Sequence, residues 1–250
     1  MRVDTLLVTK GLCSTRQEAQ EAVAMGSVLV NGQLVTKQSK DVSENSVISV
    51  SWARKYVSRG GEKLEGIFFD TFLTKERINQ FLIGKVALDV GSSTGGFTDF
   101  LLQNSISEVT CVDVGSFQLH EKIISDKRVH VFENTDIRNF KSDKKYEVVV
   151  GDISFISLEK VLSTIMSFGA ADTFFFLLIK PQFEVGKGNT KKGIVKSSDL
   201  VEKILCKYRK IANDNLCNDV TILPCRVAGS DGNQEYFLTF RTSVTVDTPK

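Results

Sequence analysis

A chain of 250 residues with 42% hydrophobic and 25% charged side chains has the composition of an ordinary globular protein. Its net charge of +2 does not by itself indicate nucleic-acid binding, and its longest strongly apolar run, residues 174–179, is too short to span a membrane. The five cysteines form no Cys-x-x-Cys pair and the two histidines add no zinc spacing, so we expect a reduced, cytoplasmic protein without a metal site.

Residues 1–50 are expected to form a small α+β domain. Ser14-Thr-Arg-Gln17 is a capping-box pattern, which predicts that a helix starts there, and Gly26 is expected to end this helix. The Asn31-Gly32 pair between two short apolar runs predicts a tight β-hairpin, and residues 47–50 could add another strand.

The next segment, residues 51–62, is expected to be a linker. Basic side chains, Arg59 among them, cluster around Gly60-Gly61, and a helix is expected to begin at Glu62. Most of these charges could simply belong to a solvated hinge, because glycine pairs and polar clusters are typical of connections.

Residues 63–241 are expected to form one α/β domain, followed by a tail over residues 242–250. Strand patterns alternate with helical segments, which are expected between the first six strands. This alternation predicts a mostly parallel, seven-stranded, Rossmann-like sheet covered by helices on both faces, with the last two strands as a hairpin at one edge. The expected strands are Val86–Val90, Val109–Val112, Val129–Phe132, Glu147–Gly151, Thr173–Ile179, Val220–Leu223 and Tyr236–Arg241.

A glycine-rich turn follows the first strand of this domain. A strand that leads into such a turn and a helix brings backbone N–H groups and the helix dipole close to a ligand, where a Cβ would block both turn and ligand. The spacing Asp-x-Gly-x-x-x-Gly-Gly matches neither the dinucleotide pattern nor the phosphate loop, and fits S-adenosylmethionine better than another nucleotide or a plain corner. The residues expected to bind this cofactor here are Asp89, Gly91, Ser92, Gly95, Gly96 and Phe97.

Polar residues end the next four strands. Asp113 would accept both ribose hydroxyls of the cofactor, and Asp136 could accept from its adenine amino group. Asp152 and Lys180 follow the two strands after these, and Asp152 would lie between the cofactor and the reacting groups. Each acid alone could be an ordinary turn residue, but the carboxyl ends of parallel strands meet at one edge, so we expect one site.

Two further residues could reach the same edge. Glu235 stands at the start of the last strand, which lies at this edge if the strand is antiparallel, and Lys63 could reach it from the helix before the first strand. Lys63, Asp152, Lys180 and Glu235 would then lie together at this edge.

The first fifty residues carry a resemblance. Arg2-x-Asp4, Ser14-x-Arg16-x-x-Ala19 and Gly26-x-Val28-x-Val30-Asn31-Gly32 resemble the RNA-binding module first named in ribosomal protein S-four. The resemblance implies that Arg2, Arg16 and Asn31 meet RNA. Five basic and five acidic residues give this segment no net charge, which favours docking guided by shape over strong electrostatic attraction.

The four residues Lys63, Asp152, Lys180 and Glu235 carry a second resemblance. They match the Lys-Asp-Lys-Glu tetrad of the FtsJ-like ribose 2′-O-methyltransferases, which implies that they are the catalytic residues. The sequence around them, residues 57–64, 152–158 and 180–188, resembles the TlyA family. This implies S-adenosylmethionine as cofactor, methylation of cytidine ribose in ribosomal RNA, and a ribosomal subunit as partner. Because the chain begins almost at Arg2-x-Asp4, it resembles the shorter form of the family, which acts on the large subunit.

A basic segment follows the fifth strand. Residues 180–210 hold nine Lys and Arg and three acids. Lys187, Lys191 and Lys192 stand among glycines in an expected loop that would suit an RNA phosphate backbone, as would Arg59, although a merely solvated loop is the alternative.

Alternatives remain at this point. The family was first labelled haemolysin, so a membrane-active protein is one, and a non-catalytic ribosome-assembly factor is another. The sequence leaves the oligomeric state open, with a monomer slightly favoured. It also leaves open whether Lys180 takes the 2′ proton as a neutral amine or orients the hydroxyl as a cation.

Overall fold

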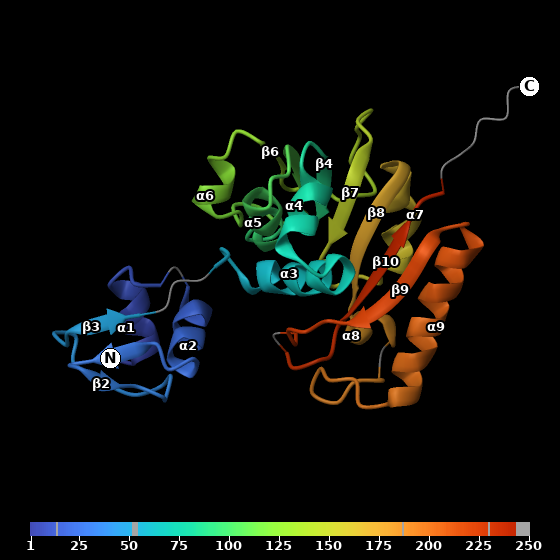
Figure 1. Cartoon of the computed structure of the whole chain (residues 1–250). Helices are drawn as coiled ribbons and strands as arrows, with labels where there is room; N and C mark the ends of the chain where they lie inside the picture. Colours follow the sequence, from blue (N-terminus) through green and yellow to red (C-terminus); the bar gives the residue numbers. More distant parts are fainter. Residues whose placement is uncertain (14, 52–54, 187, 230, 244–250) are drawn as a thin grey trace, which may run out of the picture. The chain divides into compact units, whose positions relative to one another are not determined.

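The computed structural model describes residues 1–13, 15–51, 55–186, 188–229 and 231–243, and the chain divides into two compact units (Figure 1). The small unit comprises Met1–Arg54 and the large unit Lys55–Lys250. The expectations placed on Ser14, on Lys187 and on most of the tail fall outside the described residues.

The small unit packs two helices against a three-stranded antiparallel sheet of order β2-β1-β3. Apolar residues from both helices and from the sheet meet in one core, with Val3, Leu7, Val23 and Val28 fully buried. Asn31 and Gly32 both have positive φ, 49° and 78°, so the predicted tight hairpin is confirmed. The elements are α1 (Val3–Thr9), α2 (Arg16–Ala24), β1 (Val28–Val30), β2 (Gln33–Leu34) and β3 (Ile48–Val50).

The N-cap of α2 is Thr15. Its side chain accepts from the backbone N–H of Glu18 at 3.1 Å. Thr-x-x-Glu is as good a capping box as Ser-x-x-Gln, and the sequence offers both in overlapping registers. The predicted end of this helix is confirmed, because Gly26 follows α2 with a φ of 70°.

The large unit contains the predicted seven-stranded sheet, of order β6-β5-β4-β7-β8-β10-β9. Strands β4 to β8 are parallel, and β10 runs antiparallel to both β8 and β9, so the predicted hairpin at one edge is confirmed. Its strands are β4 (Val86–Val90), β5 (Glu108–Val112), β6 (Val129–Phe132), β7 (Tyr146–Gly151), β8 (Gly169–Ile179), β9 (Asn218–Pro224) and β10 (Tyr236–Arg241).

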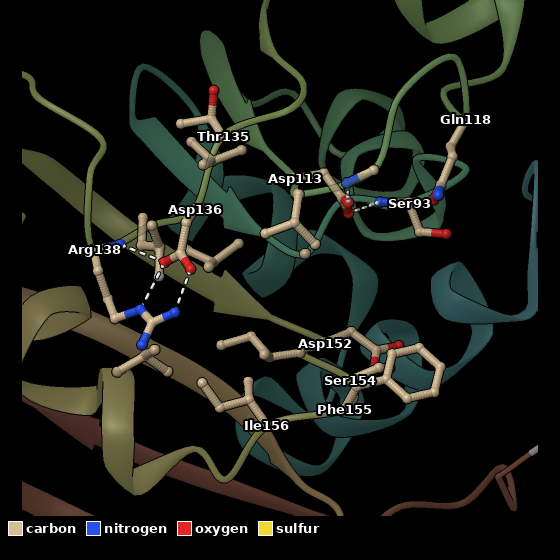
Figure 2. A pocket seen from close by; sticks show the side chains of 18 residues that line it. Ser93, Asp113, Gln118, Thr135, Asp136, Arg138, Asp152, Ser154, Phe155 and Ile156 are labelled. Atoms are coloured by element: carbon tan, nitrogen blue, oxygen red, sulfur yellow. Dashed lines mark hydrogen bonds and ion pairs between the residues drawn. The ribbon is translucent and has the colours of Figure 1, made fainter.

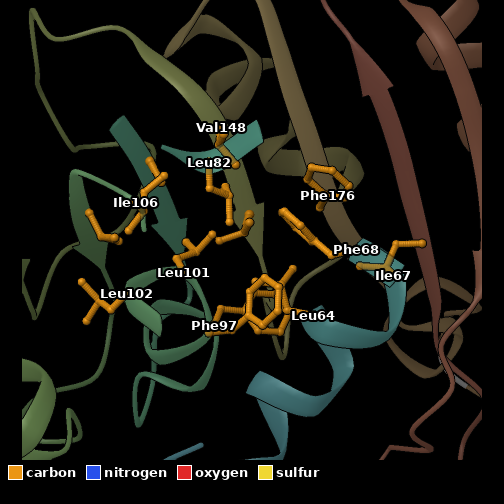
Figure 3. Close-up of a cluster of buried hydrophobic side chains, with 14 of the residues drawn as sticks. Leu64, Ile67, Phe68, Leu82, Phe97, Leu101, Leu102, Ile106, Val148 and Phe176 are labelled. Carbon is orange, nitrogen blue, oxygen red and sulfur yellow. The ribbon is translucent and has the colours of Figure 1, made fainter. Parts of the chain in front are cut away.

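Helices cover both faces of this sheet, as Figure 1 shows. Along β8 the side chains alternate: Phe176 and Leu178 join the core under α3, α4 and α5 (Figure 3), while Phe175 and Leu177 join the core under α7 and α9. Burial on both faces explains why these strands are continuous apolar runs. The helices are α3 (Arg59–Phe72), α4 (Lys75–Leu82), α5 (Gly96–Gln103), α6 (Glu121–Ile124), α7 (Glu159–Ser167), α8 (Pro181–Glu184) and α9 (Ser198–Asp214).

Two predictions about helices are wrong. The described residues 133–145, between β6 and β7, contain turns and no helix. Asp136 organises these turns, since its carbonyl accepts from Asn139 and Phe140 and its side chain accepts from Arg138 N–H. A local side-chain acceptor of this kind competes with helix formation.

The second concerns the start of α3, which begins at Arg59 and not at Glu62, so it includes the glycine pair. A Cβ on Gly61 would lie 2.2 Å from the ring of Tyr56, and one on Gly96 would lie 2.2 Å from Ser58 Oγ and 2.8 Å from Gly61 N. The glycines therefore allow close packing between the first turn of α3 and α5. This packing also makes residues 55–62, expected as part of a linker, a portion of the large unit.

Candidate active site

The four candidate catalytic residues meet at the carboxyl edge of the sheet. Lys180, directly after β8, places its Nζ 2.6 Å from Asp152 Oδ1, and Asp152 follows β7. Lys63 Nζ, from α3, lies 3.5 Å from Asp152 Oδ2 and 2.6 Å from Glu235 Oε2. The four side chains thus form one continuous chain of alternating charge, Lys180–Asp152–Lys63–Glu235.

Burial and charge balance each other in this tetrad. The residues Lys63 and Lys180 are each 8% exposed and Glu235 is 3% exposed, while the side chain of Asp152 keeps 21% of its surface open. Burial alone would raise the pKa of Asp152, but the ammonium groups of Lys180 and Lys63 outweigh it and leave that pKa below its ordinary value. Burial lowers the pKa of Lys63, yet the carboxylates of Asp152 and Glu235 raise it further, so the net shift is upward. Asp152 is therefore ionised and Lys63 protonated near neutral pH.

Ser154 is a fifth member of this cluster that the sequence reasoning missed. Its Oγ accepts a hydrogen bond of 2.6 Å from Lys180 Nζ, so it shares that ammonium with Asp152. Ser154 stands two residues after Asp152 in the same strand-end loop, and this proximity was the available signal.

A cavity of about 460 Å³ opens beside the tetrad, within the range of small-molecule sites (Figure 2). Asp152 and Ser154 line it, so cavity and tetrad share residues. Of the predicted cofactor residues, the cavity is lined by Gly91, Asp113, Asp136 and Asp152. A Cβ at Gly91 would lie 3.0 Å from the carbonyl oxygen of Asp152, and its φ of 78° also favours glycine.

The two other acids of the cavity are held differently. Asp113 accepts from the backbone N–H of Ser93 at 2.8 Å and of Gly115 at 2.7 Å, which joins the turn after β4 to the loop after β5. Asp136 is paired through both oxygens with the guanidinium of Arg138, at 2.9 and 2.5 Å. This pairing lowers the pKa of Asp136 to about 2, so its carboxylate is an acceptor at any ordinary pH.

The remaining predicted cofactor residues do not line the cavity. A Cβ at Gly95 would meet Ile123 at 2.9 Å and Leu119 at 3.0 Å, and Gly96 packs against the start of α3 as described above. Glycine is therefore required at these two positions because protein segments pack closely there. The sequence had suggested that a ligand approaches these glycines. Phe97 likewise is a core residue that stacks on Phe237 with ring centroids 6.1 Å apart.

Asp89 and Ser92 are buried and do not line the cavity. Asp89 accepts 2.6 Å from Thr98 Oγ1, whose hydroxyl also contacts Cys111 Sγ at 3.1 Å. The second oxygen of Asp89 and the Oγ of Ser92 are among the described buried atoms that have no hydrogen-bond partner. Burial raises the pKa of Asp89 to about 7, because no basic group offsets the loss of hydration.

The predicted RNA-binding residues have local partners. Arg2 Nη2 and Arg16 Nε lie 2.8 and 3.1 Å from Asp4 Oδ2, with the arginine side chains 42% and 55% exposed. Asn31 Oδ1 accepts from Val47 N–H at 2.9 Å, across the hairpin sheet. Arg59 donates to the carbonyl of Ala228. Lys191 and Lys192 are exposed, with a turn connecting them to Ile194.

No group of three His, Cys, Asp or Glu residues in the described ranges is arranged to hold a metal ion. Among the helices that the structure describes, none is long and apolar enough to cross a membrane.

Comparison with known proteins gives this geometry a family. The FtsJ-like methyltransferase model matches residues 56–242, and the S4 domain model matches residues 1–48. Hemolysin A of Brachyspira hyodysenteriae is 36% identical over 245 residues, which cover 96% of this chain and 99% of that protein. The 16S/23S rRNA (cytidine-2′-O)-methyltransferase TlyA of Mycobacterium tuberculosis is 35% identical over 247 residues, 96% of this chain and 90% of its own length.

A solved structure from Streptococcus thermophilus, which carries a provisional hemolysin name, is similar over almost the full length of the chain. It superposes with a TM-score of 0.73 at 30% identity and covers 99% of this chain and 92% of its own. Both resemblances drawn from the sequence are therefore confirmed, and the chain belongs to the FtsJ-like methyltransferase family, with an S4 domain at its N-terminal end.

Proposed function

We propose that this protein transfers a methyl group from S-adenosylmethionine to the ribose 2′-oxygen of a cytidine in ribosomal RNA. The observation that carries the proposal is the position of Asp152, which belongs both to the charged tetrad and to the cavity wall. A methyl donor bound in the cavity and an acceptor hydroxyl at Lys180 would therefore both lie next to Asp152.

The cavity suits S-adenosylmethionine in shape and chemistry. Asp113 offers carboxylate oxygens where ribose hydroxyls would need acceptors, and Asp136 is a permanent anion able to accept from an adenine amino group. Val114, Ile137 and Ile156 supply apolar surface to the same cavity. When bound, this cofactor supplies a methyl group on a positively charged sulfur. An oxygen nucleophile can attack the methyl carbon in line and displace the sulfur.

The tetrad would position the acceptor and manage its proton. The lowered pKa of Asp152 makes it a weak base, and Lys63 is held as a cation, so neither is suited to take the 2′ proton. Glu235 is paired with Lys63 and does not line the cavity. Lys180 is therefore the candidate, and the cavity-lining residues Asp152 and Ser154 hold its nitrogen in place. In one mechanism neutral Lys180 takes the proton as the 2′-oxygen attacks. In the other, charged Lys180 orients the hydroxyl and the proton leaves to water.

Ribosomal RNA is proposed as the substrate on two grounds. The chain carries an S4 domain beside its methyltransferase domain, and the M. tuberculosis relative is named for cytidine 2′-O-methylation of 16S and 23S rRNA. The expectation that the large subunit is the target stays a prediction. Such a substrate is consistent with activity in the cytoplasm, and we propose that localisation with it.

The proposal is tested by mapping 2′-O-methylcytidine in both ribosomal RNAs from cells with and without the gene, and by transfer of labelled methyl to purified subunits. Asp113→Ala should weaken S-adenosylmethionine binding in calorimetry by at least tenfold, since a ribose acceptor is lost. Asp143→Ala, an exposed carboxylate outside the cavity, is the matched control and should bind normally.

Cofactor binding without any methyl on either RNA would overturn the enzymatic proposal in favour of an assembly factor. An unchanged affinity of Asp113→Ala for S-adenosylmethionine would show that the cofactor does not bind in this cavity. Leakage of liposomes by the purified protein at the concentrations used for transfer would favour the membrane-active alternative.

A further inference from the structure

The basic segment after Lys180 contains an ordered turn, residues 191–194, which we call the basic turn. Lys191 N donates to Ile194 O at 2.9 Å, and Ile194 N donates to Lys191 O at 3.1 Å, so the two residues pair as in a β-hairpin. The two central residues both have positive φ, 52° for Lys192 and 80° for Gly193. Positive φ at both central positions is the signature of a type I′ turn.

Lys192 occupies a backbone conformation that its side chain does not favour. Asn, Asp and Gly are the usual residues at the first central position of such turns, because they tolerate the left-handed region. A lysine with positive φ persists only where the surroundings hold it, and such residues gather at functional sites. Both Lys191 and Lys192 are exposed.

Asn233 is the residue that holds the basic turn. Its side chain is buried, with 3% of the residue exposed, and its amide uses both ends: Nδ2 donates to Gly193 O at 2.9 Å, and Oδ1 accepts from Val195 N at 3.0 Å. An amide alone among side chains of this size offers a donor and an acceptor together, so neither Asp nor Leu could replace it.

Asn233 lies in the segment that leads into β10, close to the tetrad residue Glu235. Asn233 stands two residues before Glu235, whose carboxylate lies 2.6 Å from Lys63 Nζ. The basic turn is therefore tied, through one buried side chain, to the segment that delivers a tetrad residue. A tie of this kind fixes two cations relative to the reaction centre and reduces the conformational entropy that RNA binding would otherwise cost.

We propose that Asn233 is a positioning residue for RNA: it fixes the basic turn so that Lys191 and Lys192 bind backbone phosphates next to the target ribose. The inference rests on the proposed function and deepens it, because it assigns substrate phosphates to a defined turn. Residues 180–210 carry nine Lys and Arg against three acids, a charge excess that suits a polyanion.

A double-mutant cycle tests this. Asn233→Ala should weaken binding of ribosomal RNA about as much as the pair Lys191→Ala and Lys192→Ala does, roughly five- to tenfold at moderate salt. The salt dependence of binding should fall by between about 1 and 2 in slope, since each lost phosphate contact removes about 0.7 to 0.9. In the protein lacking both lysines, Asn233→Ala should have no further effect.

Two further variants serve as controls for this experiment. Val195→Pro removes the N–H that Asn233 accepts from, without altering the strand that carries Glu235, and should reproduce the loss of RNA affinity. Asn189→Ala removes an amide of the same loop that bonds only Val185 O, and should bind RNA like the wild type. Unchanged cofactor affinity in calorimetry shows that each variant is folded.

The result that would overturn the inference is an Asn233→Ala protein with wild-type RNA affinity and salt slope. An equal further loss of affinity in the background without the lysines would also overturn it, because Asn233 would then act through another group such as Glu235. RNA binding is measured without methyl transfer, so a wild-type protein that binds RNA and transfers no methyl overturns the proposed function alone.

Discussion

Each unit of this protein places an aspartate between two basic side chains, and the two clusters differ in the kind of base. In the small unit Asp4 is fully buried and meets the guanidinium groups of Arg2 and Arg16 and the amide of Gln20. In the large unit Asp152 meets the ammonium groups of Lys180 and Lys63. The charge pattern is the same, one acid between two cations.

The type of basic side chain distinguishes a structural cluster from one that can take part in proton transfer. Hydrogen bonds from Arg2 lower the pKa of Asp4, and Asp4 in turn raises the pKa of Arg2, so no proton moves in this cluster at ordinary pH. A guanidinium also binds both oxygens of a carboxylate at once, as Arg2 does, which fixes geometry. An ammonium is a single rotatable donor group that can lose its proton beforehand, and the neutral amine can then accept the proton that a hydroxyl must give up in methyl transfer.

Asp89, in contrast, has no basic partner among the described residues. Its side chain has no exposed surface, like that of Asp4, but it lies in a central strand of the sheet and is bonded by Thr98. The pKa of Asp4 is held below its ordinary value, whereas that of Asp89 is raised to about 7. The two pKa values shift in opposite directions because Asp4 has basic partners close to the surface, whereas Asp89 is deeply buried and has none among the described residues.

The largest expected effect comes from removing Lys180, the tetrad residue proposed to take the 2′ proton or to orient the hydroxyl. Lys180→Ala should lower methyl transfer at least 100-fold, as loss of a positioned acid–base group does, while cofactor binding in calorimetry stays normal. The matched control is Lys160→Ala on the exposed side of α7, which should transfer at the wild-type rate. Wild-type activity in Lys180→Ala would show that the tetrad is structural, like the Asp4 cluster.

Lys180→Arg sharpens the comparison, because it makes the large-unit cluster resemble the small-unit one. A guanidinium keeps the charge and cannot act as a base near neutral pH. Transfer well above that of Lys180→Ala, measured in single turnovers, indicates that the cation only orients the hydroxyl. Activity as low as that of Lys180→Ala indicates proton abstraction.

A smaller effect is expected from the pH dependence of Asp89. Since its folded pKa is about 7 and its unfolded value about 3.8, the folded protein holds a proton that the unfolded chain has lost between these values. The free energy of unfolding of the large unit should therefore fall as pH rises from about 4 to about 7, by at most about 4 kcal/mol. Asp89→Asn should flatten this slope in urea unfolding at a series of pH values. An identical slope in the variant would assign the pH dependence to other groups.

The small unit should respond to pH in the opposite sense. The folded pKa of Asp4 lies below the unfolded value, so its stabilisation is present above about pH 4 and is lost as pH falls below that. Asp4→Asn should destabilise the small unit by about 2 kcal/mol, the order of a charged hydrogen bond to a buried group. Hydrogen exchange of amides in α1 and α2, measured in the full chain, reports this directly. Exchange rates equal to wild type would mean that Gln20 and the backbone suffice.

The smallest effect is expected from exchanging the base in the small unit. Arg16→Lys keeps a cation near Asp4 at a side chain that is 55% exposed, where solvent screens the pair. We expect a loss of less than about 1 kcal/mol in the same exchange experiment. A larger loss would show that the guanidinium geometry at Arg16 matters as much as its charge.

Local patterns in the sequence determined much of this protein. The Asn31-Gly32 pair predicts its hairpin because both turn residues need positive φ. The apolar runs predict the seven strands because a parallel sheet buries both faces. Their place at strand ends and the family resemblance selected the tetrad residues Lys63, Asp152, Lys180 and Glu235. In the structure three ion pairs connect these four side chains.

Tertiary structure decided what depends on contacts between distant segments. Gly61 begins a helix and not a linker because Tyr56 and Gly96 pack against it, and Gly95 is required by α6 and not by the cavity. Asn233 meets the basic turn forty residues earlier in the chain, through two hydrogen bonds. Propensity and periodicity act over a few neighbouring residues, whereas these side chains are chosen by surfaces that exist only after folding, so no local pattern marks them.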